Sequence, residues 1–324
     1  MTSQPKQPIY SFLSIGQRGV GKTVFLAACY LESHQDTEQQ RLLWFDCEDR
    51  DARRTIDNLL VYVAKTGEYP PATLKITNFE FLLKQRSQWG HQTLGQVRWW
   101  DVPGESCHVH NPAFTAMLNH SDGCCLFLDA PSLVQTADDP ASLTKLLQPL
   151  ESVVELVVYQ GLSLPLAIIL TKCDQLPPHP LFWQRLKKAL NPLVTRLQEW
   201  QANYQLFYSE IPITEIDGVS TLQLTRVGTP IYWLFSNIHR SRQGETETVD
   251  PQMPYYIPTP LPAWFHRLLG AKPTKINQTD TPQHEIFLII LLLMALFTLG
   301  VGIVLQQDLL PKSEGLQQNS LPRK

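Results

Sequence analysis

Gly16-Gln17-Arg18-Gly19-Val20-Gly21-Lys22-Thr23 fits the pattern G-x-x-x-x-G-K-[ST], in which a glycine-rich loop binds phosphate. Glycines let the backbone wrap a phosphate chain with its N–H groups pointing inwards. We expect Lys22 to reach the β- and γ-phosphates, which gives it a catalytic role, and the Thr23 hydroxyl to ligate Mg²⁺. The residues assigned to nucleotide binding in this stretch are Gly16, Arg18, Gly19, Val20, Gly21, Lys22 and Thr23.

The segments on either side of this loop agree with that assignment. Ile9–Ile15 is an apolar run typical of a strand, and Val24–Leu31 is typical of a helix. A strand, a glycine loop and a helix N-terminus in this order place an anion at the positive end of the helix dipole. The stretch therefore predicts a nucleoside triphosphate as ligand.

Composition narrows the class of protein further. The chain has 324 residues, 43% of them hydrophobic, and a formal net charge of −3. This charge gives no electrostatic reason to expect nucleic-acid binding. The six cysteines contain no C-x-x-C pair, so we expect reduced, buried thiols and no cysteine metal site.

A second motif follows the predicted strand Gly95–Trp100. It is Asp101-Val102-Pro103-Gly104, an Asp-x-x-Gly sequence at a strand end downstream of the phosphate loop. In phosphate-loop switches such an aspartate holds Mg²⁺, usually through water, and the glycine N–H bonds the γ-phosphate. We therefore assign Asp101 to the metal and Gly104 to the nucleotide.

A third motif, Thr171-Lys172-Cys173-Asp174, follows the apolar strand predicted at Leu164–Leu170. The Asp174 carboxylate can accept two hydrogen bonds from the N1–H and exocyclic amine of guanine. Adenine lacks this pair of donors, so a buried acceptor built for them would reject it. Thr171, Lys172 and Asp174 are assigned to nucleotide binding, with Lys172 lying along the base.

With these three motifs in this order, the chain resembles the translation-factor-related class of P-loop GTPases, which includes Ras-like small G proteins and the signal-recognition-particle receptor β subunit. The resemblance covers roughly residues 9–240. It implies an α/β fold with a mostly parallel sheet flanked by helices, GTP or GDP with Mg²⁺ as ligands, and two switch loops. It also implies a base-contacting loop after the sixth strand, where Thr214 is the nearest equivalent. A Mg²⁺-ligating threonine belongs to the first switch, where Thr73 is our choice and Thr77 the alternative.

Three departures from the Ras-like pattern matter. Lys22 and Asp101 stand further apart than in a compact Ras-like domain, so we interpret residues 32–65 as an insertion that binds a partner or regulates the domain. Glu105 stands where Ras-like members usually carry the glutamine that orients the attacking water. We assign Glu105 as a catalytic residue and expect slow hydrolysis, because the γ-phosphate repels a nearby carboxylate. The alternative is that Glu105 acts as a base with a raised pKa. Ras-like members often have glycine at the position of Arg18. The Arg18 side chain would approach the phosphates, block an arginine supplied in trans or face solvent.

The C-terminal quarter differs in composition from the nucleotide-binding domain predicted at residues 1–240. Residues 241–285 form a proline-rich linker, and residues 286–305 carry no charge. A helix of that length matches a hydrocarbon core of about 30 Å. We expect a single-pass, C-terminally anchored membrane protein with residues 306–324 as a short polar tail. Because GTP and Mg²⁺ are cytosolic, the nucleotide-binding domain is expected in the cytosol.

These observations predict a membrane-anchored GTP-binding protein that hydrolyses GTP slowly with Mg²⁺ and acts as a switch. Its partners would bind through the switch loops or through residues 32–65. The alternative is a non-hydrolysing, GTP-bound scaffold or receptor subunit, which Glu105 favours. An ATPase is the third hypothesis, and nucleotide competition separates it from the other two.

The Asp174→Asn variant tests the base assignment. We expect its binding to shift from guanine towards xanthine nucleotides, because an amide presents a donor to the base edge. Competition between labelled GDP and xanthosine diphosphate measures this shift. An unchanged guanine preference would count against the contact.

Overall fold

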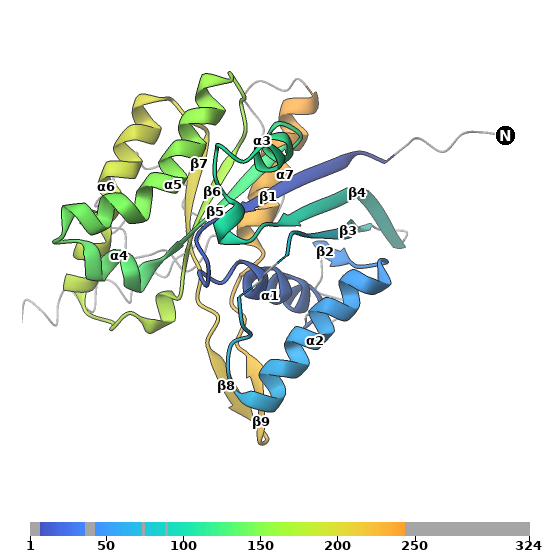
Figure 1. Ribbon diagram of the computed structural model, residues 1–324. Helices are drawn as coiled ribbons and strands as arrows, with labels where there is room; N and C mark the ends of the chain where they lie inside the picture. Colours follow the sequence, from blue (N-terminus) through green and yellow to red (C-terminus); the bar gives the residue numbers. More distant parts are fainter. Residues whose placement is uncertain (1–6, 36–42, 73–74, 88–89, 244–324) are drawn as a thin grey trace, which may run out of the picture. The chain divides into compact units, whose positions relative to one another are not determined.

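The computed structural model describes residues 7–35, 43–72, 75–87 and 90–243 (Figure 1). The linker beyond residue 243, the expected membrane span at residues 286–305 and the tail at residues 306–324 lie outside these residues. Within the described ranges, no helix is both long enough and apolar enough to cross a membrane.

Seven strands of the described residues form one sheet: β1 (Ile9–Ile15), β2 (Leu43–Asp46), β3 (Thr77–Ser87), β4 (Gly90–Asp101), β5 (Gly123–Asp129), β6 (Leu166–Thr171) and β7 (Tyr204–Tyr208). Their order is β2-β3-β4-β1-β5-β6-β7. Strands β4, β1, β5, β6 and β7 run parallel, whereas β3 is antiparallel to both of its neighbours. The predicted mostly parallel sheet is therefore confirmed.

Helices cover both faces of this sheet: α1 (Lys22–Gln35), α2 (Arg50–Thr66), α3 (Pro112–Asn119), α4 (Ala130–Thr136), α5 (Pro140–Tyr159), α6 (Pro180–Glu199) and α7 (Thr229–Gln243). Buried residues of α1, α2 and α7 share one apolar cluster, and those of α3 to α6 share a second. Neighbouring residues of β1 alternate between them, since Phe12 belongs to the first cluster and Leu13 to the second. Strands buried on both faces explain the near-continuous apolar runs in the sequence.

The region that we interpreted as an insertion is built into the sheet. It supplies β2, which pairs with β3, and α2, which lies on the same side as α1 (Figure 1). Asp49 caps α2 by accepting hydrogen bonds from the backbone N–H groups of Asp51 and Ala52, and the helix ends at Gly67. A hairpin of β8 (Ile213–Ile216) and β9 (Val219–Leu222) packs beside α2. Whether this region binds a partner stays a prediction.

Helix α6 contains a proline in its interior, Pro192, and does not end there. Proline costs one backbone hydrogen bond inside a helix. The buried face of α6, which includes Leu190, Leu193 and Leu197, outweighs that cost.

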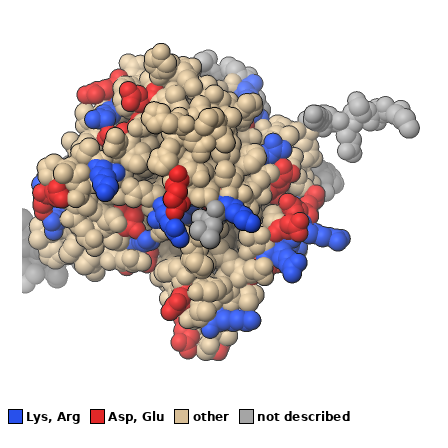
Figure 2. Space-filling model, viewed as in Figure 1, with Lys and Arg blue, Asp and Glu red and all other residues tan. Residues whose placement is uncertain are grey.

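Over the face of the molecule seen in Figure 2, acidic and basic side chains are interspersed.

The α6 face gives a test of the fold. Leu193 is fully buried, whereas Leu181 on the same helix is 58% exposed. We expect Leu193→Ala to lower the free energy of unfolding by about 2–5 kcal/mol, because it leaves a cavity. Leu181→Ala should change it by less than about 0.5 kcal/mol. Urea denaturation of both variants measures the difference, and equal losses would contradict the assigned packing.

Candidate functional site

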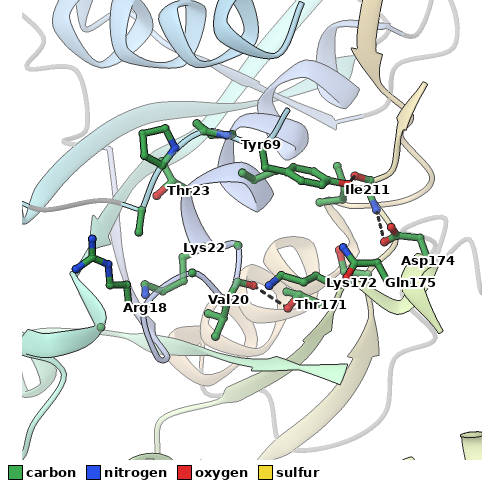
Figure 3. Close-up of a pocket in the computed structure, with 18 residues that line it drawn as sticks. Arg18, Val20, Lys22, Thr23, Tyr69, Thr171, Lys172, Asp174, Gln175 and Ile211 are labelled. Carbon is green, nitrogen blue, oxygen red and sulfur yellow. Dashed lines mark hydrogen bonds between the residues drawn. The ribbon is translucent and has the colours of Figure 1, made fainter. Parts of the chain in front are cut away.

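A pocket opens where the phosphate loop meets the carboxyl ends of the parallel strands (Figure 3). It unites the three segments that the sequence singled out with two more, residues 69–72 and the pair Ser209 and Ile211. Its lining residues are Arg18, Gly19, Val20, Gly21, Lys22, Thr23, Val24, Tyr69, Pro70, Pro71, Ala72, Gly104, Thr171, Lys172, Asp174, Gln175, Ser209 and Ile211. Ligands of open α/β sheets bind at this edge.

The phosphate loop connects β1 to α1 in a tight turn. Gly21 has a φ of 96°, a conformation that residues with a side chain rarely adopt. Lys22 is buried, and its Nζ donates to the carbonyl oxygens of Gly16 at 2.9 Å and Gln17 at 3.2 Å. Burial lowers the pKa of the Lys22 ammonium, although nearby acidic groups oppose this. The carbonyl oxygens of the loop therefore hold the Lys22 ammonium at the floor of the pocket.

The two residues assigned to the metal from described parts of the chain lie together. The Thr23 hydroxyl donates to Oδ2 of Asp101 at 2.6 Å, and the Ser14 hydroxyl donates to Oδ1 at 3.2 Å. Asp101 ends β4 opposite Ser14 of β1, and it is completely buried. A hydroxyl and a carboxylate side by side are the hard oxygen ligands that Mg²⁺ prefers, so the donor set fits this ion.

The threonine of the first switch cannot be placed beside them. Thr73, our choice, lies outside the described residues. Thr77, the alternative, begins β3 opposite Asp101 and does not line the pocket. Within the described ranges, no three histidine, cysteine, aspartate or glutamate side chains form a group that would hold a metal by themselves. Any Mg²⁺ site here would need oxygen ligands from phosphate or water as well.

The Asp101–Gly104 segment lies directly on the phosphate loop. A Cβ on Gly104 would come within 2.2 Å of the Arg18 backbone nitrogen, so only glycine fits there. The next residue, Glu105, accepts a hydrogen bond from Arg18 Nη1 at 3.0 Å. Its own backbone N–H and the Arg18 guanidinium lower the pKa of the Glu105 carboxyl. These contacts stabilise the ionised form of the Glu105 carboxyl, and its role in hydrolysis stays a prediction.

The third motif forms the opposite side of the pocket. The buried Thr171 hydroxyl donates to the Val20 carbonyl at 2.7 Å, which ties the end of β6 to the phosphate loop. Lys172 has a φ of 57°, uncommon for a residue with a side chain, and its Nζ donates to Asp129 Oδ2 at 2.6 Å. Asp174 lies in the short helix η2 (Cys173–Gln175) and accepts from the Ile211 N–H at 3.4 Å. Thr171, Lys172 and Asp174 thus share one wall, and their roles stay predictions.

The expected base-contacting residue is elsewhere. Thr214 lies in β8, paired with Thr221, and does not line the pocket. Ser209 and Ile211, which directly follow β7, line it instead. The buried Ser209 hydroxyl oxygen has no hydrogen-bond partner among the described residues. Residues immediately after β7, such as Ser209, line the pocket, whereas the chain leaves the pocket where it enters the β8–β9 hairpin.

Sequence reasoning also missed the role of Tyr69. Tyr69 to Ala72, which directly precede the predicted switch residue Thr73, line the pocket. The Tyr69 hydroxyl donates to the Ile211 carbonyl at 2.9 Å, which fastens this segment to the wall formed after β7 (Figure 3). Burial, with a smaller effect of the nearby Asp174 charge, raises the pKa of Tyr69. The hydroxyl therefore stays protonated and keeps donating.

Comparison with known proteins adds little to this geometry. No protein-family model matches the chain, and no curated protein matches it. Among solved structures, the chain is similar to the Arl6 BBS3 small GTPase from Trypanosoma brucei with a bound nucleotide analogue, GppNp. The two are 12% identical, with a TM-score of 0.39, over 72% of this chain and 99% of the other. At this TM-score the superposition is too loose to assign a role to any residue.

Proposed function

We propose that the domain ending near residue 240 binds a guanine nucleotide with Mg²⁺ and hydrolyses GTP slowly, as a Ras-like P-loop GTPase would. One observation carries this proposal: a single pocket is lined by the phosphate loop, Gly104 and the Thr171–Asp174 wall. These segments are far apart in the sequence, and each has a distinct task in binding a nucleotide. A glycine-rich turn that matched the motif by chance would have no reason to share a pocket with the other two.

The phosphate end has the groups that a triphosphate needs. Lys22 is held by loop carbonyls, and it would exchange these for phosphate oxygens. Thr23 and Asp101 would hold Mg²⁺, with the buried carboxylate acting through water. When bound, Mg²⁺ neutralises the charge that develops on the phosphate oxygens.

The base end supports guanine over adenine. Asp174 is partly buried at the pocket wall, and its carboxylate faces the Ile211 N–H. A guanine base would give this carboxylate two donors, and adenine would leave it unpaired. Ser209, which follows β7, also lines the pocket.

A non-hydrolysing, GTP-bound scaffold is the second candidate, and Glu105 is the observation that favours it. The Arg18 guanidinium beside it favours its ionised form, which a γ-phosphate would repel. It stands where Ras-like members usually carry the glutamine that orients the attacking water. Slow hydrolysis and no hydrolysis are therefore the two outcomes to separate, and an ATPase is the third candidate.

Nucleotide binding and single-turnover hydrolysis test these functions on one preparation of the full chain. We expect labelled GTP to bind, excess EDTA to weaken its binding, and equimolar ATP to leave it bound. Hydrolysis should be slow but faster than in buffer alone. Displacement by ATP would contradict the guanine assignment, and the absence of hydrolysis would select the scaffold.

We further propose that residues 286–305 anchor the chain in a membrane, with the nucleotide-binding domain in the cytosol and partners recruited through the pocket's switch loops or residues 32–65. The uncharged composition of this segment supports the anchor. In cells that express the full chain, we expect it to stay with membranes after alkaline carbonate extraction. A chain that ends at residue 285 should be released. Release of both would contradict the anchor.

A further inference from the structure

Arg18 and Glu105 form an ion pair between two segments of the pocket. Arg18 is the third residue of the phosphate loop, and Glu105 follows Gly104 in the short helix η1 (Gly104–Ser106). Arg18 Nη1 lies 3.0 Å from Glu105 Oε1. Beneath this pair, the Gly104 backbone packs against the Arg18 backbone too closely to admit a Cβ. The ion pair therefore joins two segments whose backbones already lie in close contact.

The two side chains differ in their relation to the pocket. Arg18 lines it, as Figure 3 shows at the rim near Thr23, whereas Glu105 is not among the lining residues. Their side chains are 58% and 54% exposed. Ion pairs with such exposure are weak, because water solvates both charges. An anion that enters the pocket can therefore compete with Glu105 for Arg18.

A phosphate group can make more hydrogen bonds with the Arg18 guanidinium than Glu105 makes through its single contact. Arg18 uses Nη1 towards Glu105, and a guanidinium has five N–H donors in a planar fork. That fork matches two phosphate oxygens at once. Lys22 also attracts Glu105, but its ammonium is buried and already donates to the loop carbonyls. Arg18 is thus the side chain that can change partners without leaving the rim.

We propose that Arg18 senses the terminal phosphate by exchanging Glu105 for it. This inference rests on the proposed function, since it requires a nucleotide in the pocket. Glu105 is then a counter-ion that opposes triphosphate binding through Arg18. The pair would make the domain discriminate between triphosphate and diphosphate.

A double-mutant cycle on the full chain tests the exchange. Wild type, Arg18→Ala, Glu105→Gln and the double variant are titrated with fluorescent GppNp and GDP in Mg²⁺, and the ratio of the two affinities is compared. We expect Arg18→Ala to lower the preference for GppNp by about tenfold or more, because a charged hydrogen bond is lost. Glu105→Gln should raise it by about threefold, because a weak competing ion pair is lost. In the Arg18→Ala background, Glu105→Gln should give no gain.

The chain offers a matched control for charge and exposure. Arg53 and Asp57 form an ion pair on α2 with side chains 61% and 57% exposed, and neither lines the pocket. Arg53→Ala and Asp57→Asn should leave the affinity ratio unchanged. Arg18→Lys keeps the charge without the planar fork, so we expect it to restore only part of the preference.

The outcomes separate the exchange from the function on which it rests. If Glu105→Gln still gives its gain without Arg18, Glu105 acts by direct repulsion and the exchange is refuted. If the ratio stays constant in every variant while both nucleotides bind, the exchange is refuted and nucleotide binding stands. If wild type binds neither nucleotide, both proposals fail together.

Discussion

The buried carboxylate of Asp101 is the constraint on which the site depends. A charge without exposure to water is costly unless it is paired, and Asp101 is paired with the hydroxyls of Thr23 and Ser14. These partners come from the start of α1 and from β1. One side chain thereby fixes the end of β4, the neighbouring strand and the helix that carries the phosphate loop. The geometry of the pocket floor follows from this arrangement.

The two ends of the pocket are joined by a second polar contact. Thr171 donates to the carbonyls of Val20 and Leu128, so that the phosphate loop, β5 and β6 share one buried hydroxyl. Tyr69 connects the segment before β3 to the wall after β7 in the same way. These contacts tie the segments that line the pocket to one another.

Patterns local in the sequence predicted most of the fold. The apolar runs predicted as strands correspond to β1 and β6, the segment after the phosphate loop forms α1, and the three motifs fall at strand ends as expected. Short helices α3 and α4 were missed because eight and seven residues are too few to establish a period. Thr214 was chosen in place of Ser209 because spacing alone does not reveal where the hairpin leaves the pocket. The Arg18–Glu105 pair depends on how closely Gly104 approaches the loop, which no sequence pattern encodes.

The edge position of β2 limits how another protein can dock by adding a strand to the sheet. An exposed edge strand offers unpaired backbone groups to an extended peptide, which binds by β-augmentation. Within the described residues, β2 pairs with four residues of the long strand β3, and Lys84 of β3 forms an ion pair with Asp46 at the end of β2. A partner that recognised this edge would meet a row of backbone groups that ends beside this charged pair.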